Sequence, residues 1–162
     1  MASTNKSDIE IIHASLPAHI EGVRTLFLEY ANSLDFSLCF QSFDKELNGL
    51  PGSYSPPSGR LLLARCGGAP AGCIALRPLE EQICEMKRLY VRPTCRGLGL
   101  GKKLVVRLIV EARTIGYSRM RLDTIGSSMK DAVGLYRRLG FQEIAPYREN
   151  PIAGALYMEL HL

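Results

Sequence analysis

Residues 92–104 read RPTCRGLGLGKKL, and this stretch decides how the middle of the chain folds. Gly97, Gly99 and Gly101 alternate with larger residues, and basic side chains stand on both sides of them. An apolar pattern with three- and four-residue spacing follows, which is typical of an amphipathic helix. A strand, a glycine-rich turn and a helix start direct several free backbone N–H groups, and the positive end of the helix dipole, towards one point. The stretch therefore predicts a site that binds an anion.

Two familiar anion-binding turns fit this spacing poorly. The dinucleotide-binding fingerprint requires GxGxxG, whereas Gly97 to Gly101 read GxGxG. The P-loop requires four residues between its glycines and a Ser or Thr after its lysine, but Lys102 is followed by Lys103. A tight turn with solvated arginines is the purely structural alternative. Alternating glycines cost conformational entropy, however, and a bound pyrophosphate, which needs small residues for close approach, would offset that cost.

The whole chain has the size and composition of one globular domain. Its 162 residues, 46% hydrophobic and 22% charged, favour a single domain covering residues 1–162. No apolar run approaches the roughly 20 residues that cross a bilayer, and the N-terminus lacks a secretory pattern, so we expect a cytoplasmic protein without a membrane partner. The five cysteines show neither CxxC nor zinc-ligand spacing, which predicts free thiols and no metal site.

Positive charge is concentrated in one part of the chain. The net charge is only +4, but ten of the twenty basic residues lie between Lys87 and Arg121, a segment with Glu111 as its single acid. Such a segment favours a polyanionic partner. A nucleic acid is a poor candidate, because the pattern lacks exposed aromatic residues and a repeated basic face. One phosphate-rich cofactor explains the charge better.

Hydrophobic periodicity and turn residues predict an α/β (α+β) order of elements. Strands are expected at residues 9–13, 60–66, 71–79, 82–91, 120–125, 141–144 and 155–160. Helices are expected from Pro17 to about Tyr30, in a shorter piece within residues 36–50, and at 101–115 and 129–139. Residues 50–59, LPGSYSPPSG, are expected to form either a substrate-facing loop or a plain connector.

Two further motifs give the glycine stretch a family context. Arg96, Gly99 and Gly101 form an Arg-x-x-Gly-x-Gly motif, RLYVRP at residues 88–93 precedes it, and AVGLYRRLGF at residues 132–141 follows it. With these motifs and this order of elements, nearly the whole chain resembles the GNAT superfamily of acyl-CoA-dependent N-acetyltransferases. The resemblance implies a single-domain fold with a mixed, mostly antiparallel sheet of about seven strands flanked by about four helices. It also implies acetyl-CoA as the co-substrate.

By this resemblance, coenzyme A lies along the middle strand and the glycine turn. Its pyrophosphate would bind the backbone N–H groups from Leu98 to Lys102, with charge added by Arg96. Its pantetheine arm would pair with the main chain of the strand before the turn, as an added strand does. The implied cofactor-binding residues are Leu89, Tyr90, Val91, Arg96, Gly97, Leu98, Gly99, Leu100, Gly101 and Lys102.

The resemblance also implies two catalytic side chains. Tyr136, in the second motif, would protonate the departing thiolate, and a phenol of pKa about 10 is a suitable neutral acid. Glu85 stands eleven residues before Arg96, where many members have a general base. An extended strand would place Glu85 on the same face as Leu89 and Val91. Two alternatives to this base stay open: Glu85 simply pairs with Lys87, or ordered water takes the proton.

At one position the chain departs from the family pattern. Met129 stands seven residues before Tyr136, where the family often has an asparagine that contacts pantetheine. Ser127 or Ser128 could supply a substitute hydroxyl.

The acceptor site is expected in the parts that vary most within the family: the first two helices, the loop after them and the last strands, including PYRENPIAGA at residues 146–155. Glu29 or Asp35 would attract a cationic amine, and Arg88 or Arg148 would hold a carboxylate. The expected acceptor is a small primary amine, amino-acid-like or polyamine-like. A protein N-terminus or lysine, a non-catalytic acyl-CoA-binding module and a homodimer stay open as alternatives. The candidate substrate-binding residues are Glu29, Tyr30, Phe36 and Arg88.

Overall fold

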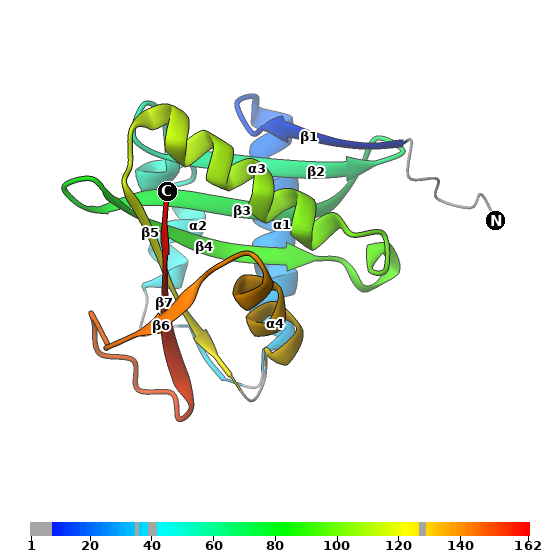
Figure 1. Cartoon of the computed structure of the whole chain (residues 1–162). Coiled ribbons are helices and arrows are strands. Elements are labelled where there is room, and N and C mark those ends of the chain that lie inside the picture. Colours follow the sequence, from blue (N-terminus) through cyan, green and yellow to red (C-terminus); the bar gives the residue numbers. More distant parts are fainter. Residues whose placement is uncertain (1–7, 35, 39–41, 127–128) are drawn as a thin grey trace.

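The structure, a computed structural model, describes residues 8–34, 36–38, 42–126 and 129–162 of the chain. Within these residues, seven strands form one sheet in the order β1-β2-β3-β4-β5-β7-β6 (Figure 1). Neighbouring strands are antiparallel except for β4 and β5, which run parallel. The strands are β1 (Ile9–His13), β2 (Arg60–Cys66), β3 (Ala69–Glu80), β4 (Ile83–Val91), β5 (Arg119–Ile125), β6 (Gln142–Ile144) and β7 (Ala155–His161).

The parallel contact between β4 and β5 is short. Only residues 83–85 of β4 pair with β5, opposite residues 119–121. β4 continues to Val91 and β5 to Ile125, so the two strands diverge beyond Glu85 (Figure 1). The second half of β4 therefore has β3 on one edge and, among the described residues, no partner strand on the other.

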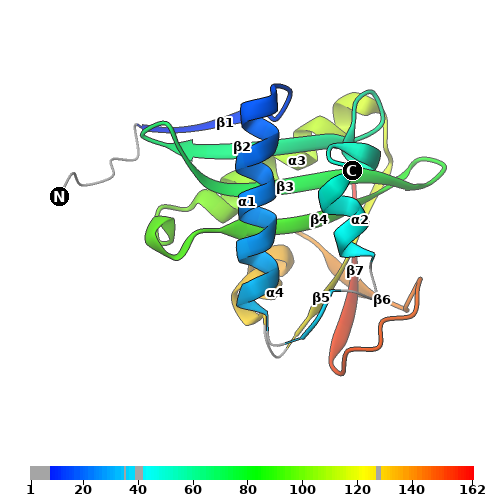
Figure 2. The same cartoon turned by 180° about the vertical axis from the view of Figure 1, so that it is seen from behind.

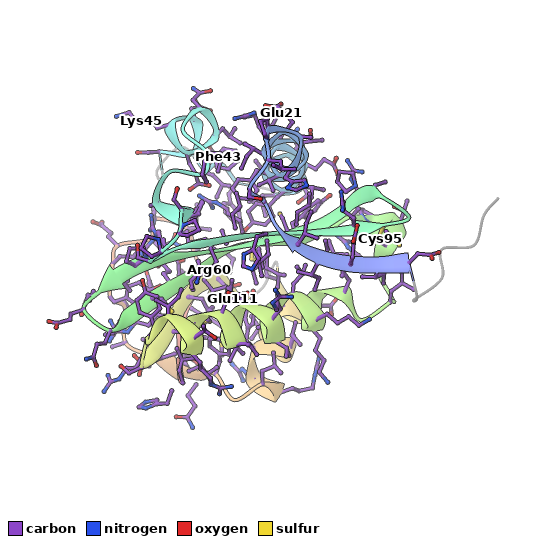
Figure 3. The ribbon with its side chains drawn as sticks, turned by 90° about the horizontal axis from the view of Figure 1, so that it is seen from above. Glu21, Phe43, Lys45, Arg60, Cys95 and Glu111 are labelled. Atoms are coloured by element: carbon purple, nitrogen blue, oxygen red, sulfur yellow. The ribbon has the colours of Figure 1, made fainter. Side chains whose placement is uncertain are left out.

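Four α-helices of the described chain cover the two faces of the sheet. α1 (Pro17–Ser33) and α2 (Phe43–Asn48) lie on one face, in front of the sheet in Figure 2, and α3 (Leu100–Ile115) and α4 (Lys130–Arg138) lie on the other. Figure 3 shows these layers edge-on, with Arg60 and Glu111 on the α3 side of the sheet. The Nε atom of Arg60 lies 2.9 Å from Oε2 of Glu111, so this ion pair joins β2 to α3.

Each face of the sheet has its own apolar core. α3 buries Leu104 and Leu108 against the sheet, as its three- and four-residue spacing predicts. α1 buries Val23 and Phe27 on the opposite face. α3 ends at Gly116, whose φ of +110° lies in the left-handed region that glycine adopts without strain. The sequence pattern thus predicts both the length of α3 and the face that it buries.

The predicted fold class is confirmed, with a mostly antiparallel sheet between two layers of helices. Residues 50–59 line neither cavity of the described chain, and they contain a short 3₁₀ turn, Gly52–Tyr54, that buries one side chain. Tyr54 is 1% exposed, and its hydroxyl donates a hydrogen bond to Glu46 at 2.9 Å.

The described cysteines, Cys66, Cys73, Cys84 and Cys95, are free thiols, and Cys39 lies outside the described residues. No helix in the described part of the chain is long and apolar enough to cross a membrane.

A β-bulge in β4 changes which side chains share a face. Arg88 has a φ of +63°, and the pairing of β4 with β3 shifts register at this point. Met86 packs in the core under α3, and so do Leu89 and Val91, although Leu89 stands three positions after Met86 rather than two or four. Glu85 therefore points to the face opposite Leu89 and Val91. The shared face expected from a regular strand is wrong, because the bulge inserts one residue.

Gly72 on β3 allows the bulged strand to approach closely. A Cβ atom at Gly72 would lie 2.8 Å from the Tyr90 carbonyl oxygen, so we expect Gly72→Ala to lower the free energy of unfolding by about 1–3 kcal/mol. Urea unfolding measures this change. Gly101→Ala is the matched control, because the nearest contact of its Cβ would be an ordinary 3.9 Å. Its free energy of unfolding should stay the same or rise by up to about 1 kcal/mol, because alanine is favoured over glycine in a helix. Equal losses in both variants would contradict the close approach.

Candidate active site

A cleft opens where β4 and β5 diverge. Its volume is about 910 Å³, and its walls come from β4, β5, the turn before α3, the α4 helix and the C-terminal end of α1. The bulged half of β4 forms one wall, and it lacks a partner strand on this side. Its main chain can therefore pair with an extended ligand.

The glycine turn closes one end of this cleft. Gly97 and Gly99 have φ of +85° and +72°, a region that side-chain-bearing residues rarely adopt. α3 begins directly after Gly99, and its first three N–H groups, at Leu100, Gly101 and Lys102, have no carbonyl one turn earlier to bond. No side chain caps this helix and no acidic residue lies in its first turn. The helix start is therefore suited to an anion.

Most of the predicted cofactor-binding residues line the cleft. Leu98 is the exception, because its side chain packs against the core under α3. Arg96 donates from Nε to the carbonyl oxygen of Val91 at 3.2 Å, which fastens the turn to the end of β4. Contact with a cofactor stays a prediction for all of them. Those that line the cleft are Leu89, Tyr90, Val91, Arg96, Gly97, Gly99, Leu100, Gly101 and Lys102.

Tyr136 lies on α4 with its ring buried and lines the same cleft. The ring packs on Phe141, with 5.7 Å between centroids, and the residue is 6% exposed. Its hydroxyl has no hydrogen-bond partner among the described residues. Burial raises the pKa of this phenol well above its usual value, and nearby Tyr30 adds to the effect. The phenol is therefore neutral at physiological pH, and its role as a proton donor stays a prediction.

Met129, at the position of the family asparagine, also lines the cleft. Its sulfur accepts a hydrogen bond from the Thr124 hydroxyl at 3.2 Å, so the position still links α4 to β5. Ser127 and Ser128 lie outside the described residues, as does Asp35.

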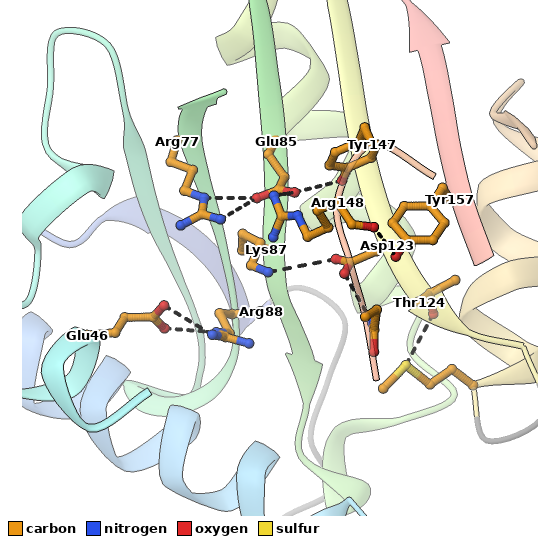
Figure 4. Close-up of polar contacts among 12 residues, drawn as sticks. Glu46, Arg77, Glu85, Lys87, Arg88, Asp123, Thr124, Tyr147, Arg148 and Tyr157 are labelled. Atoms are coloured by element: carbon orange, nitrogen blue, oxygen red, sulfur yellow. Dashed lines mark hydrogen bonds and ion pairs between the residues drawn. The ribbon is translucent and has the colours of Figure 1, made fainter. Parts of the chain in front are cut away.

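Glu85 is fully buried and surrounded by donors (Figure 4). Arg77 donates to Oε1 at 2.8 Å, Tyr147 donates to Oε2 at 2.6 Å, and Arg148 also bonds Oε2. Burial raises the pKa of this carboxyl, but Lys87, Arg77 and the other donors more than offset it, so the pKa lies below its usual value. Glu85 does not line the cleft. These contacts argue against Glu85 as the general base.

Lys87 and Asp123 connect the two strands that diverge. The Lys87 Nζ atom on β4 lies 3.8 Å from Oδ1 of Asp123 on β5 (Figure 4), and both residues line the cleft. Burial lowers the pKa of Lys87 to about 8, against the opposing effects of Glu85 and Asp123. Asn150 donates to Oδ2 of Asp123 at 3.3 Å. Asp123 thus contributes a carboxylate to the wall of the cleft, whereas Glu85 contributes none.

The candidate substrate-binding residues have different environments. Tyr30 lines the cleft at the end of α1, and burial raises its pKa. Glu29 is bound to Arg92, with 2.6 Å between Oε2 and Nη2, and this hydrogen bond lowers the pKa of the Glu29 carboxyl. Phe36 packs against the core under α1 and does not line the cleft. The structure thus places only Tyr30 of these three on the cleft wall.

Arg88 also lines the cleft, but its guanidinium group binds a protein carboxylate. Glu46 on α2 accepts hydrogen bonds from its Nε at 2.8 Å and its Nη2 at 3.1 Å (Figure 4). The Phe43 ring lies 5.1 Å from the guanidinium carbon. A role for Arg88 in holding a substrate carboxylate is therefore unsupported, because Glu46 already takes that place.

Sequence reasoning missed three residues of the site: Arg77, Asp123 and Tyr147. They come from β3, β5 and the segment before β7, and no motif links them in the chain. The segment 146–155, which the sequence places near the acceptor site, contacts Glu85 on β4 through Tyr147 and Arg148. Only the folded chain brings Arg77 and Tyr147 to Glu85 and Asp123 to Lys87.

Solved structures show the same fold. An acetyltransferase from Streptococcus agalactiae, 22% identical, has a TM-score of 0.78 over 96% of this chain and 99% of its own. The PaiA N-acetyltransferase of Thermoplasma acidophilum, in complex with coenzyme A, is 20% identical, with a TM-score of 0.71 over 95% and 99% of the two chains. The chain therefore shares its fold with these acetyltransferases, and within that fold the glycine turn at the start of α3 is suited to an anion.

Sequence relatives identify the family. Residues 21–141 match the Acetyltransferase (GNAT) family. An uncharacterised N-acetyltransferase of Schizosaccharomyces pombe is 41% identical over 158 residues, covering 96% of each chain. The chain belongs to the GNAT family and is an acyl-CoA-dependent N-acetyltransferase, as the two sequence motifs indicated.

The left-handed backbone at Gly99 should be essential for coenzyme A binding. A β-branched side chain at a φ of +72° is strained, so we expect Gly99→Val to displace the first turn of α3 and abolish binding measured by calorimetry. Gly116→Val is the matched control, because Gly116 has a φ of +110° at the opposite end of the same helix. That variant should lose stability but bind coenzyme A. Equal affinity of Gly99→Val and the wild type would refute the site.

The buried carboxylate of Glu85 should make stability depend on acidic pH. Its folded-state pKa is lowered from 4.5, so the ionised form contributes stability that is complete above 4.5 and lost as pH falls through the folded-state pKa. Glu85→Gln should cost about 3–5 kcal/mol near neutral pH, and the difference from wild type should narrow below about pH 4.5. Urea unfolding at a series of pH values measures this, with Glu10→Gln on edge strand β1 as control. If the difference in free energy of unfolding between wild type and Glu85→Gln widened as pH fell, the lowered pKa of Glu85 would be contradicted.

Proposed function

We propose that the protein transfers an acetyl group from acetyl-CoA to the primary amine of a small molecule, directly within a ternary complex. The observation that carries this proposal is the position of Tyr136, which lines the same cleft as the glycine turn. Burial keeps its phenol neutral, and its hydroxyl lacks a partner among the described residues. A neutral phenol can give its proton to a departing thiolate.

The cleft offers a continuous path for the donor. Acetyl-CoA, when bound, supplies an activated thioester. The N–H groups at the start of α3 would bind its pyrophosphate, and Arg96 and Lys102 would add positive charge. The main chain of residues 89–91 would orient the pantetheine arm and the thioester carbonyl. Acetyl as the acyl group is part of this proposal.

The proton of the amine leaves through water in the cleft rather than to Glu85. Both oxygens of Glu85 accept hydrogen bonds from protein donors, so the carboxylate has little capacity to accept a proton from an amine. Asp123 faces the cleft and is held in place by Lys87 and Asn150. Water beside Asp123 is the proposed acceptor, which follows one of the two alternatives that the sequence left open.

A compact acceptor fits this site better than a polypeptide. Tyr147 and Arg148 fasten the segment before β7 to Glu85 on β4, which restricts access from that side. Acetylation of a protein N-terminus or lysine is the alternative that the same assay tests. Cytoplasmic location, a single domain over residues 1–162 and the absence of nucleic-acid partners stay predictions, and dimerisation stays open.

Release of the coenzyme A thiol with a panel of small amines and short peptides tests this function. The wild type should release thiol with small amines and not with peptides. Tyr136→Phe should lower kcat by about 10²- to 10⁴-fold while coenzyme A binding is kept. Tyr117→Phe is the control, because the Tyr117 hydroxyl bonds the Ser58 carbonyl outside the cleft at 2.6 Å. Full activity of Tyr136→Phe, or turnover confined to peptides, would overturn the proposal.

A further inference from the structure

A second, smaller cavity shares two wall residues with the cleft. Its volume is about 260 Å³, and its walls come from Ser42, Glu46, Arg77, Lys87, Arg88, Arg148 and Glu149. Lys87 and Arg88 line both this cavity and the large cleft. A molecule in the small cavity would therefore adjoin the point where β4 bulges and the cleft begins.

Most charged side chains around this cavity are paired within the protein. Arg88 is matched by Glu46, with which it forms two hydrogen bonds. The remaining buried cluster contains three cations, Arg77, Lys87 and Arg148, but two carboxylates, Glu85 and Asp123. Arg77 and Arg148 share the single carboxylate of Glu85. Glu149, which is exposed, also lines the cavity, so the cations and carboxylates around it are equal in number. A ligand there would bind the donors that the two arginines leave unused, rather than balance an excess of charge.

Both arginines keep donors for a ligand. Arg77 uses Nε and Nη2 on Oε1 of Glu85, and its Nη1 makes no hydrogen bond to a described residue. Arg148 bonds Glu85 through Nη2 only, which leaves Nε and Nη1. The two side chains are 30% and 23% exposed, so they reach the surface of the cavity.

Arg148 is also fixed in position before any ligand arrives. Its guanidinium carbon lies 5.1 Å from the centre of the Tyr147 ring. Tyr157 donates from its hydroxyl to the Arg148 carbonyl oxygen at 2.8 Å. Two arginines held on one buried carboxylate make a preorganised site for a planar anion, because guanidinium groups match carboxylate geometry.

We propose that Arg77 and Arg148 bind the carboxylate of the acceptor, which is therefore an amino acid or another short amine that bears a carboxylate. This inference rests on the proposed function and narrows its acceptor. The carboxylate binds in the small cavity, and the amine points past Lys87 into the cleft. Glu85 is a positioning residue that holds the two arginines. A polyamine would fit these two donors poorly, because its ammonium groups would face the guanidinium groups of Arg77 and Arg148.

Matched pairs of acceptors test the subsite. The probes are the α-amino acids, short β- and γ-amino acids, the carboxamide of each, and polyamines, assayed by thiol release with saturating acetyl-CoA. For the acids that turn over, kcat/KM should exceed that of the carboxamide by at least about tenfold, mainly through KM. Equal turnover of acids and carboxamides, or a preference for polyamines, overturns the inference while leaving the acetyltransferase proposal intact.

Variants assign the preference to the two arginines. Arg77→Met and Arg148→Met should each reduce the acid-to-carboxamide ratio at least about fivefold, whereas a general loss of structure would lower both rates equally. Arg60→Met is the matched control, because Arg60 forms an ion pair with Glu111 away from the cavity, and its ratio should equal that of the wild type. If a methionine variant fails to fold, Arg77→Lys or Arg148→Lys replaces it and should lower the ratio by loss of the planar fork. An unchanged ratio in the folded variants overturns the inference.

Binding separates this inference from the function on which it rests. Thermal unfolding of the protein saturated with coenzyme A should shift upwards with the preferred amino acids and not with their carboxamides. If no small amine turns over, the proposed function fails. In that case, a rise in the unfolding temperature with the amino acids but not with their carboxamides still supports the carboxylate subsite. Equal rises with both, or no rise with either, overturn the inference.

Discussion

The separation of β4 from β5 is the constraint on which the rest of the site depends. The two strands pair over residues 83–85 and then diverge, and Lys87 and Asp123 face each other across the gap at 3.8 Å. A regular parallel pair would use the main chain of residues 86–91 in the sheet and leave no cleft. The bulge at Arg88, with its positive φ, turns the second half of β4 towards the glycine turn.

The cluster around Glu85 makes this irregular geometry stable. A carboxylate with no exposed surface would be very costly alone, but cations and a tyrosine hydroxyl surround it. These partners come from β3 and from the segment before β7, so the cluster connects both halves of the sheet. The same arginines that neutralise Glu85 retain donors at a cavity. Structural stability and the proposed recognition of a carboxylate therefore share one set of charges.

The basic segment between Lys87 and Arg121 serves more than one purpose. Arg88, Arg92 and Arg107 pair with Glu46, Glu29 and Glu111. Arg121 pairs with Glu159. These arginines are neutralised within the protein, so a cofactor is needed to explain only the charges that remain at the glycine turn. The single polyanion inferred from the sequence accounts for part of the segment, because most of the partner carboxylates lie elsewhere in the chain.

What the sequence determined by itself is local. The spacing of Gly97 and Gly99 before an amphipathic run predicts the turn and the start of α3, because backbone conformation and helix periodicity depend on neighbouring residues. Tyr136 on its short helix follows in the same way. The bulge in β4, the burial of Glu85 and its contacts with Arg77 and Tyr147 were decided only by the tertiary structure. They depend on contacts between residues 8 and 62 positions apart, and no pattern of neighbours encodes which distant donors a buried carboxylate will meet.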